Sequence, residues 1–406
     1  MTPPTGPCPI STTTMNAPGS VPSEAGGNAV GLLCAILAVT LAGFGISLTH
    51  PLFAVLMERK GYSGLEIGLS SSSLAIAMLA GGLLMPRVVA RTGLIPIMAA
   101  AAACCSSMLL IAGAMDDYFG WIAARFGFSL GATALFFGSE LWIVSGAPAA
   151  RRGLWLGIYG LLLSGGFLSG PLLLNAVGTL GWAPFLWAAL IMACAALPVL
   201  IGGRHAPRNF GSAPASVLET LRYFRTDPSL IWGVVLYSVF EFGVLGLLPV
   251  WGLRIGLEEG VAIALVALVP LGNMLLEMPM GIASDRYPRR LLMMICASGA
   301  LLTGLLMPVW AGWEVGLTGL LLVAGGVVVG LYVLPLAEFG ARYTGDALSR
   351  ANGAVIVGYG LGALLAPTFL GQAMDIAGPH GLPWGLAALA GVYLVLLAWR
   401  GRARSA

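Results

Sequence analysis

Charged residues are scarce in this sequence: only 9% of its 406 residues are Asp, Glu, Lys or Arg, whereas 58% are hydrophobic. A typical soluble domain carries about 25% charged residues, so we expect most of this chain to lie in lipid. The net charge of +3 is small, and we expect no nucleic-acid partner. The bilayer is the first partner that the composition predicts.

Motifs of enzymes and of ATP-driven pumps are also missing. The sequence has no Walker motif, no His-Glu-x-x-His or Gly-x-Ser-x-Gly stretch, and no dinucleotide fingerprint in a strand-turn-helix context. Its six cysteines have neither a pairing pattern nor the spacing of metal ligands, so we interpret them as packing residues. We therefore expect no catalytic residue, no metal site and no cofactor.

Long apolar runs are what the sequence has in abundance. A transmembrane helix needs about 20 mostly apolar residues. We therefore predict an all-α integral membrane protein with twelve transmembrane helices. The predicted segments are 29–57, 64–88, 94–114, 118–146, 153–178, 182–201, 229–253, 260–283, 290–311, 315–341, 350–376 and 381–399.

One connection is longer and more polar than the others, and it separates the predicted helices into two groups of six. We predict a first bundle at 29–201, a cytoplasmic linker at 202–228, a second bundle at 229–399 and a cytoplasmic tail at 400–406. Residues 1–28 are polar and rich in Pro, Ser, Thr and Gly. We see no signal peptide there and expect a disordered cytoplasmic N-terminus.

The two predicted halves resemble each other. Residues 139–174 and 336–370 each begin with a Glu near a helix end, pass through a turn that contains Arg, and enter a Gly-rich helix with a Pro. Parallel repeats are typical of proteins whose two bundles rock against each other. We therefore predict two pseudo-symmetric six-helix bundles that use alternating access.

Most basic residues fall on one side of the predicted helices. Short loops rich in Lys and Arg stay in the cytoplasm, so we predict that both termini and the linker are cytoplasmic in a multi-pass protein of the bacterial inner membrane. The residues on this side are Arg87, Arg91, Arg151, Arg152, Arg204, Arg208, Arg222, Arg225, Arg286, Arg289, Arg290, Arg342, Arg350, Arg400, Arg402 and Arg404.

The loop after the eighth predicted helix carries the most specific pattern. Its stretch GIASDRYPRR, residues 281–290, resembles the G-x-x-x-D-R-x-x-R-R signature of the major facilitator superfamily. Arg125 and Gly131, in the stretch RFGFSLGATA, resemble that superfamily's motif in helix 4. The resemblance covers residues 29–399, and its drug-efflux-like or uncharacterised bacterial branch looks most similar.

The fifth predicted helix matches that superfamily only in part. Gly166, Gly170 and Pro171 resemble its antiporter motif, but Leu173 and Leu174 stand where the motif has glycines. The resemblance implies the major facilitator fold and a secondary transporter, and the helix 5 motif favours exchange against protons.

The same loop predicts a gate at the cytoplasmic end. Gly281 would let another helix approach closely. Asp285 can accept hydrogen bonds from the free amides of a neighbouring helix N-terminus, which in the facilitator fold would lie near Gly153 and Leu154. Two interpretations remain open for Arg286, Arg289 and Arg290. They could pair with carboxylates at helix ends, or they could serve only to fix the topology.

The gate is predicted to be asymmetric. Glu338, near the end of the tenth helix, is placed to pair with the arginines of the second-half loop. In the first half, Pro86 stands where the corresponding Asp belongs, so Arg87 or Arg91 would have to pair with Glu140 instead. We therefore predict that the second-half loop holds the gate when the substrate cavity faces out.

Acids inside helices mark functional sites, because each costs a few kcal/mol or more in the bilayer. Glu241, near the middle of the seventh helix with Tyr237 one turn below it, is our candidate for the proton-coupling group. Glu277 is the second candidate and shares a helix face with Asn273 and Gly281. Glu241 could equally be kept neutral by hydrogen bonds, and Glu277 could serve the interface between the bundles.

Two basic groups inside helices are further candidates. Arg125 could bind an anionic group or hold a carboxylate charged, or it could pair with a backbone carbonyl as a structural residue. His50 lies on a stripe of small and polar residues along the first helix and could titrate near neutral pH, or it could serve packing alone.

Three functions compete. The leading one is a monomeric secondary transporter that exports a small organic molecule by proton antiport. Import by proton symport is the alternative, since acidic residues serve either scheme. A sensor or scaffold that kept the fold without transport is the third, and the intact loop and Glu241 argue against it.

Overall fold

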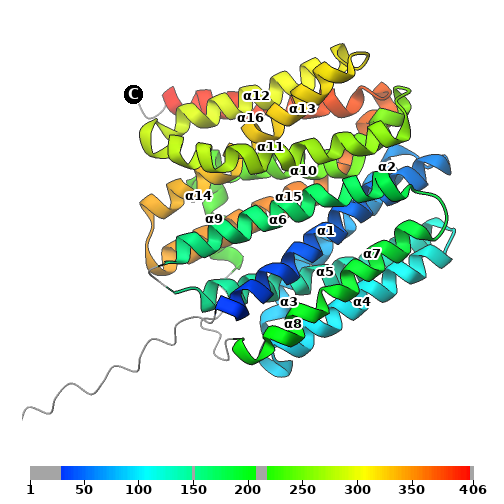
Figure 1. The fold of residues 1–406 in the computed structure, drawn as a ribbon. Coiled ribbons are helices and arrows are strands. Elements are labelled where there is room, and N and C mark those ends of the chain that lie inside the picture. Colours follow the sequence, from blue (N-terminus) through cyan, green and yellow to red (C-terminus); the bar gives the residue numbers. More distant parts are fainter. Residues whose placement is uncertain (1–28, 149–150, 207–216, 403–406) are drawn as a thin grey trace, which may run out of the picture.

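The computed structural model describes residues 29–148, 151–206 and 217–402, and within these ranges the chain is helical (Figure 1). Twelve helical spans are long and apolar enough to cross a membrane, as predicted. The first six are α1 (Ala29–Arg59), α2 (Gly64–Ser71) with α3 (Ser73–Thr92), α4 (Leu94–Ala114), α5 (Tyr118–Gly146), α6 (Arg152–Val177), and α7 (Ala183–Cys194) with α8 (Ala196–Gly202).

The second six spans follow the same order. They are α10 (Pro228–Arg254), α11 (Glu259–Arg286), α12 (Arg289–Val309), α13 (Glu314–Val328) with α14 (Gly330–Arg342), α15 (Gly345–Ala377) and α16 (Gly381–Arg402). In Figure 1, α10–α13 and α16 of the second group lie toward the top and α3–α5, α7 and α8 of the first group toward the bottom, while α6 and α15 overlap between them. The expected disordered segment 1–28 lies outside the described residues, as do 403–406 of the predicted tail.

Three spans that we predicted as continuous helices are interrupted. In the second span, α2 ends and α3 begins at Ser72, whose hydroxyl lies 3.1 Å from the Gly68 carbonyl and 2.7 Å from the Leu364 carbonyl. Serine side chains that bond to backbone carbonyls compete with the helix. The break before α8 lies at Ala195, three residues ahead of Pro198, which lacks the N–H that would bond to Cys194. The third break lies at Val329.

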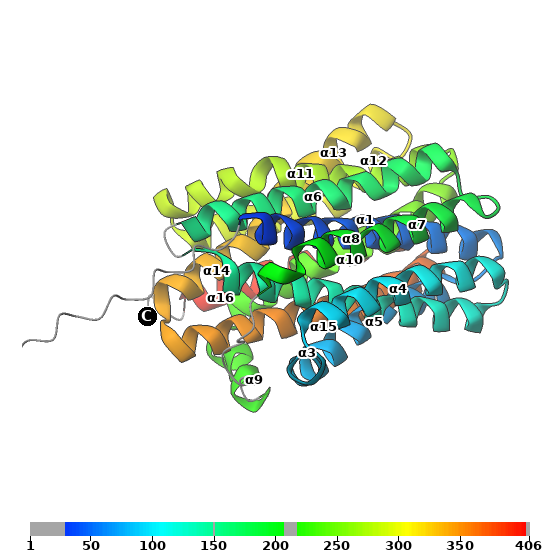
Figure 2. The same ribbon diagram turned by 60° about the horizontal axis from the view of Figure 1, so that its bottom comes forward.

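The predicted linker also contains structure. After the 3-10 turn η2 (Gly203–His205), the chain forms the helix α9 (Val217–Thr226) just before α10. The Tyr223 hydroxyl donates to the Ala347 carbonyl at 3.0 Å, and its ring packs against Phe339. Residues 221–226 of this segment therefore dock on the second bundle, as Figure 2 shows for α9 beside α15.

The two ends of the molecule carry different charges. We call the end that holds Arg87, Arg91, Arg286, Arg289, Arg290 and Arg342 the arginine-rich end. We call the opposite end, where acids outnumber bases, the acidic end; its acids are Glu58, Glu66, Asp116, Asp117, Glu258, Glu259, Glu314 and Asp375. Each span runs from one end to the other, so α1, α6, α10 and α15 start at the arginine-rich end.

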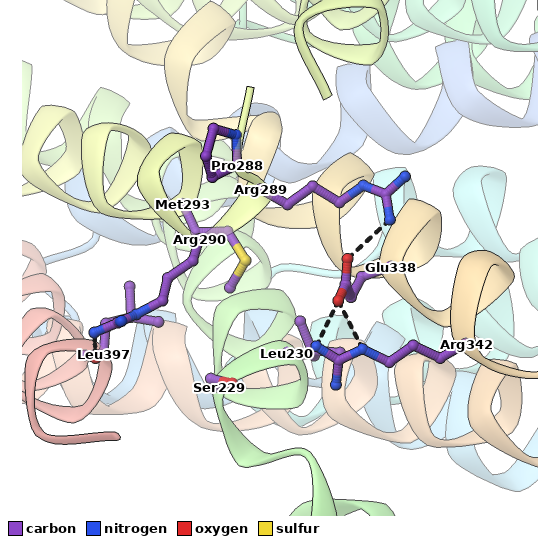
Figure 3. Close-up of a pocket in the computed structure, with 9 residues that line it drawn as sticks. All are labelled: Ser229, Leu230, Pro288, Arg289, Arg290, Met293, Glu338, Arg342 and Leu397. Atoms are coloured by element: carbon purple, nitrogen blue, oxygen red, sulfur yellow. Dashed lines mark hydrogen bonds and ion pairs between the residues drawn. The ribbon is translucent and has the colours of Figure 1, made fainter. Parts of the chain in front are cut away.

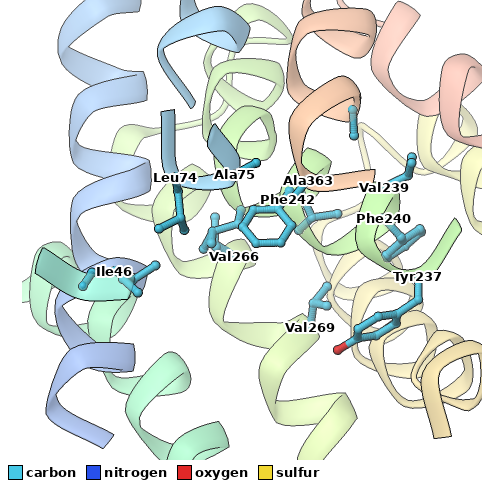
Figure 4. Packing of buried hydrophobic residues seen from close by; sticks show 14 of the residues in the cluster. Ile46, Leu74, Ala75, Tyr237, Val239, Phe240, Phe242, Val266, Val269 and Ala363 are labelled. Atoms are coloured by element: carbon cyan, nitrogen blue, oxygen red, sulfur yellow. The ribbon is translucent and has the colours of Figure 1, made fainter. Parts of the chain in front are cut away.

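The bundles meet along α2 and α3 against α15, α6 against α11, and α1 against α10. At mid-height this interface is apolar: Ile46 and Leu74 of the first bundle and Phe242 and Val266 of the second belong to one buried cluster (Figure 4). Buried residues make up 89% of the most apolar stretch of α10 but only 17% of that of α6. The helix α10 is therefore the inner helix of its bundle, whereas much of α6 remains accessible.

Candidate functional site

A chain of ion pairs joins the two bundles at the acidic end. Arg254, in the last turn of α10, donates through Nε and Nη2 to the carboxylate oxygens of Glu58 in α1, at 2.8 and 2.9 Å. Its Nη1 lies 3.4 Å from Oδ1 of Asp375 in α15. The Arg254 and Glu58 side chains are 19% and 20% exposed. Because these charges are largely withdrawn from water, their bidentate pairing holds α1 to α10.

Asp375 forms a second link between the bundles by capping α2. Its Oδ1 accepts from the Gly64 N–H at 2.7 Å and its Oδ2 from the Leu65 N–H at 2.8 Å. These amides have no partner within their own helix, and the positive end of the helix dipole favours a carboxylate there. A carboxylate of the second bundle thus satisfies a helix N-terminus of the first.

The helices α2 and α15 also touch backbone to backbone below this cap. A Cβ added at Gly64 would strike the Gly371 carbonyl oxygen, and one added at Gly371 would strike that of Gly64. A third link lies between α1 and α11, where Arg59 pairs with Glu259 and the Thr179 hydroxyl donates to the same carboxylate at 2.5 Å. The acidic end is therefore closed by charge and by close packing.

The helices α6 and α11 diverge toward the arginine-rich end. Near the acidic end, a Cβ at Gly260 of α11 would lie 2.7 Å from Oδ1 of Asn175 in α6. Near the arginine-rich end, a Cβ at Gly157 of α6 or at Gly281 of α11 would meet no atom within 4 Å. Gly281 faces open space in this conformation, so the close approach that we predicted for it is not formed here.

The loop after α11 shows the same separation. Asp285 and Arg286 are exposed, and among the described residues no hydrogen bond to Asp285 is found. The predicted pair between Arg289 and Glu338 is present, with Nη1 2.8 Å from Oε2. Glu338 also pairs with Arg342, which reaches Asp227 at 3.0 Å. Arg289, Glu338 and Arg342 lie in the second bundle, and Asp227 directly precedes its first helix. None of these pairs therefore links the two bundles.

The predicted partners of the first-half gate lie elsewhere. Arg87 and Arg91 are exposed in the last turns of α3. Glu140 accepts a hydrogen bond from the Tyr159 hydroxyl at 2.9 Å, between α5 and α6. We had expected an arginine as its partner, but the tyrosine on the neighbouring accessible helix occupies that position.

Glu241 lies halfway along α10, about 20 Å from either end at a rise of ~1.5 Å per residue. Its side chain is half-buried, and its Oε2 accepts from the Tyr359 hydroxyl of α15 at 2.7 Å. Within the described parts of the chain, no ion pair involves Glu241. A carboxyl group at this depth is held by a neutral donor, so it can carry a proton without breaking an ion pair.

Tyrosines from three helices surround Glu241. The Tyr237 ring of α10 lies 5.3 Å from the Tyr332 ring of α14 and 6.2 Å from the Tyr359 ring, measured between centroids. The Asn273 amide of α11 donates to the Tyr237 hydroxyl at 3.3 Å, while its own Oδ1 is buried and has no hydrogen-bond partner among the residues that the structure describes. We call Tyr237, Tyr332, Tyr359 and Glu241 the tyrosine–glutamate cluster.

Glu277 lies where α11 faces α6. Its side chain is half-buried, and a Cβ at Gly160 of α6 would have only the Glu277 Oε1 as a neighbour, at 4.0 Å. Glu277 therefore lies between the two bundles, a position that fits both the cavity role and the interface role that we left open. Glu277 lies one turn along α11 from Asn273, which contacts Tyr237, and it lies near Gly160, the residue after Tyr159. Glu140, Glu277 and Glu241 therefore belong to one acidic, tyrosine-lined region.

Arg125 and His50 form a separate site within the first bundle. Both are 3% exposed, and the Arg125 guanidinium lies 3.3 Å from Nδ1 of His50 and 3.2 Å from the Ser70 hydroxyl. Its guanidinium carbon also lies 4.9 Å from the centre of the Phe53 ring. Across the described residues no carboxylate pairs with Arg125. The two residues meet each other, which we did not predict, and they do not contact Glu241.

The glycines of the helix 5 motif serve packing between α6 and α1. A Cβ at Gly166 would strike the Thr40 carbonyl, and one at Gly170 would strike the Ser47 hydroxyl. The Ser47 hydroxyl lies 3.4 Å from the Gly166 carbonyl, and Pro171 follows within the same helix. The stripe that we had noted along α1 thus faces α6 inside the bundle rather than an aqueous space.

Some site residues were missed by the sequence analysis. Tyr159, Tyr332 and Tyr359 were not singled out, because a tyrosine in an apolar helix is normally a packing residue. The links at the acidic end were missed as well, although Glu58 and Asp375 sit at helix ends next to short loops. Their pairing joins positions up to 311 residues apart, and no local pattern reveals such contacts.

Comparisons with known proteins agree with this architecture. A family model described as "Major Facilitator Superfamily" matches residues 35–270 and 259–406. An uncharacterized MFS-type transporter of Bacillus subtilis is 25% identical over 348 residues, covering 84% of this chain and 88% of that protein. A similarly described transporter of Yersinia enterocolitica is 24% identical and covers 90% of this chain and 94% of its own.

Solved structures show the same fold at low identity. A bacterial homologue of the human lysosomal transporter Spinster, in an inward-facing and unoccupied conformation, has a TM-score of 0.72 at 16% identity, covering 93% of this chain and 96% of that one. A nucleoside transporter has a TM-score of 0.77 at 14% identity, with 91% and 99% covered.

Proposed function

The chain belongs to the major facilitator superfamily and is a secondary membrane transporter, and from this premise we propose that it exports a small organic molecule in exchange for protons. The observation that carries the proposal is Glu241, a half-buried acid midway along α10 that is bonded to a tyrosine and paired with no described base. Such a group can take up and release protons as water reaches it from either side.

The orientation follows from the charge asymmetry between the two ends. Basic loop residues favour the cytoplasmic side, so we assign the arginine-rich end and both termini to the cytoplasm of a bacterial cell. In this orientation the acidic end faces outward and is closed, while α6 and α11 part toward the cytoplasm. The conformation is then inward-facing, and Glu241 would exchange protons with the cytoplasm.

Alternating access requires that the acidic end open as the arginine-rich end closes. Gly281 and Asp285 are free to make contacts in the second state, because both face open space in this one. We propose that Asp285 then caps the start of α6, because the first amides of a helix have no acceptor within the helix itself. Arg289 and Glu338 remain paired within the second bundle and stiffen the loop that carries Asp285.

The chemistry of the central region favours a particular kind of substrate. Glu140, Glu241 and Glu277 are three acids in a region with four tyrosines, and tyrosine rings attract cations as well as apolar surfaces. An amphiphilic molecule with a positive charge therefore fits better than an anion. A proton and such a cation would compete for the same carboxylates, which is the requirement for exchange.

The test uses inverted membrane vesicles whose interior has been acidified. Adding an exported cation should release protons and collapse the gradient, as followed with a pH-sensitive dye across a panel of organic compounds. Glu241→Gln mimics the protonated acid, so it should abolish this response while keeping exchange of substrate for substrate, which moves no net proton.

Glu277→Gln is the matched control, since it removes an acid of the same region that faces α6. A normal response in Glu241→Gln would exclude Glu241 as the coupling group. Loss in Glu277→Gln alone would assign the role to α11. Compounds that collapse only a gradient of the opposite sign would show import by symport.

A further inference from the structure

A cavity of about 270 Å³ opens at the arginine-rich end of the second bundle (Figure 3). It lies between the starts of α10 and α12 and the ends of α14 and α16. Its charged lining consists of Arg289, Arg290, Arg342 and Glu338. Three guanidinium groups thus face a space that contains one carboxylate.

The charges of this lining do not balance. Glu338 is shared by Arg289 and Arg342, and Asp227 takes a further nitrogen of Arg342 from beside the cavity. The contact found for Arg290 is the Leu397 carbonyl, to which its Nη2 donates at 2.8 Å. A carbonyl neutralises no charge, so one positive charge remains uncompensated among the described groups.

Hydrogen-bond donors are also left over. The Nε of Arg289 is buried and has no partner within the described part of the chain, although unpaired buried polar groups are costly. The helix α12 begins at the cavity, at Arg289, and the first amides of a helix have no partner within it. Guanidinium groups together with helix amides are the usual binding partners of a phosphate group.

The rest of the wall is apolar, formed by Leu230, Pro288, Met293 and Leu397. Beside it, Leu291 and Trp399 project from α12 and α16 with 48% and 66% of their surfaces exposed, as expected for side chains that face lipid. A ligand with a phosphate next to hydrocarbon matches both parts of this lining, whereas a small soluble anion matches only the arginines.

We propose that this cavity binds the phosphate of an anionic phospholipid from the adjoining leaflet, with Arg290 as its main charged contact. Basic pockets between transmembrane helices on the cytoplasmic side bind such headgroups in other membrane proteins. The proposal does not depend on the transported substrate. Since only Tyr287 and Pro288 separate the last turn of α11, which carries Asp285, from Arg289, an occupied site would hold that turn at a fixed place relative to α12.

The test measures lipid binding to the purified full-length protein by native mass spectrometry. Phosphatidylglycerol should be retained over phosphatidylcholine of the same chain length. Arg290→Gln should lower the affinity for phosphatidylglycerol about tenfold, the usual effect of losing a hydrogen bond to a charged group. Arg286→Gln is the matched control, because Arg286 is an exposed arginine at the end of α11 that does not line the cavity.

A second variant separates binding from damage to the fold. Glu338→Gln removes the acid that competes for the arginines, so it should bind phosphatidylglycerol more tightly, which a misfolded protein would not do. Equal retention of the two lipids, or equal loss in Arg286→Gln and Arg290→Gln, would overturn the proposal. Displacement of the lipid by millimolar inorganic phosphate would support the phosphate site and assign it to a soluble anion.

Discussion

The two ends of the molecule are built from similar charged residues but use them differently. At the acidic end, Arg254 and Asp375 of the second bundle bind Glu58 and the start of α2 in the first. At the arginine-rich end, the ion pairs of Glu338 remain inside the second bundle. Both ends therefore carry ion pairs. The closed end differs from the open one because its ion pairs join the two bundles, whereas those of the open end stay within one bundle.

The largest effect is expected from a side chain placed in the closed seam. Gly371→Ala puts a methyl group against the Gly64 carbonyl, and such overpacking costs up to about 3 kcal/mol. We expect the acidic end to open. Spin labels at Leu180→Cys and Gly312→Cys, in a cysteine-free background, would report a longer distance between the bundles.

Gly281→Ala is the matched substitution at the other end, where the added methyl group meets nothing within 4 Å. It should leave the present conformation unchanged. An equal lengthening of the label distance in both variants would show that glycine loss loosens the helices in general, and the contrast between the ends would fail.

A smaller effect is expected from breaking the ion-pair chain itself. Arg254→Gln leaves Glu58 and Asp375 close together without their shared cation, which should cost about 2 kcal/mol and shift the balance between states about 30-fold. The same pair of labels measures the shift. Lys60→Gln is the control, because Lys60 pairs with Asp116 inside the first bundle; a matching shift there would contradict the role of inter-bundle pairing.

The smallest effect is expected at the open end. Asp285→Asn removes a charge for which no hydrogen bond or ion pair is found among the described residues. It should therefore only disfavour the opposite state, by about 1 kcal/mol, the usual scale of a charge at a helix terminus. Labels at Thr92→Cys and Tyr287→Cys should show a more uniform, wider separation, and transport should slow. An unchanged distance distribution would leave the loop as a topology signal alone.

Much of the architecture could be predicted because membranes impose simple rules. The segments 94–114 and 118–146 match α4 and α5 in full, since their ends are set by charges and turns that a bilayer excludes. The break at Ser72 was missed because the hydroxyl that disturbs the helix bonds to Leu364, a partner far along the chain. The site was only partly predictable for the same reason: Glu241 is visible as an isolated acid, whereas Tyr332 becomes notable only once α14 lies beside it.

The contact between Gly64 and Gly371 also limits how this sequence can evolve. A side chain at either position would strike a carbonyl of the opposite helix, so no exchange of side chains elsewhere could make room for it. A larger residue in a core is usually compensated by a smaller neighbouring side chain. Such compensation cannot work for this pair, because the obstacle is backbone. We expect relatives to carry other residues at these two positions only where the two helices lie farther apart. Both positions should remain glycine wherever the acidic end closes in this way.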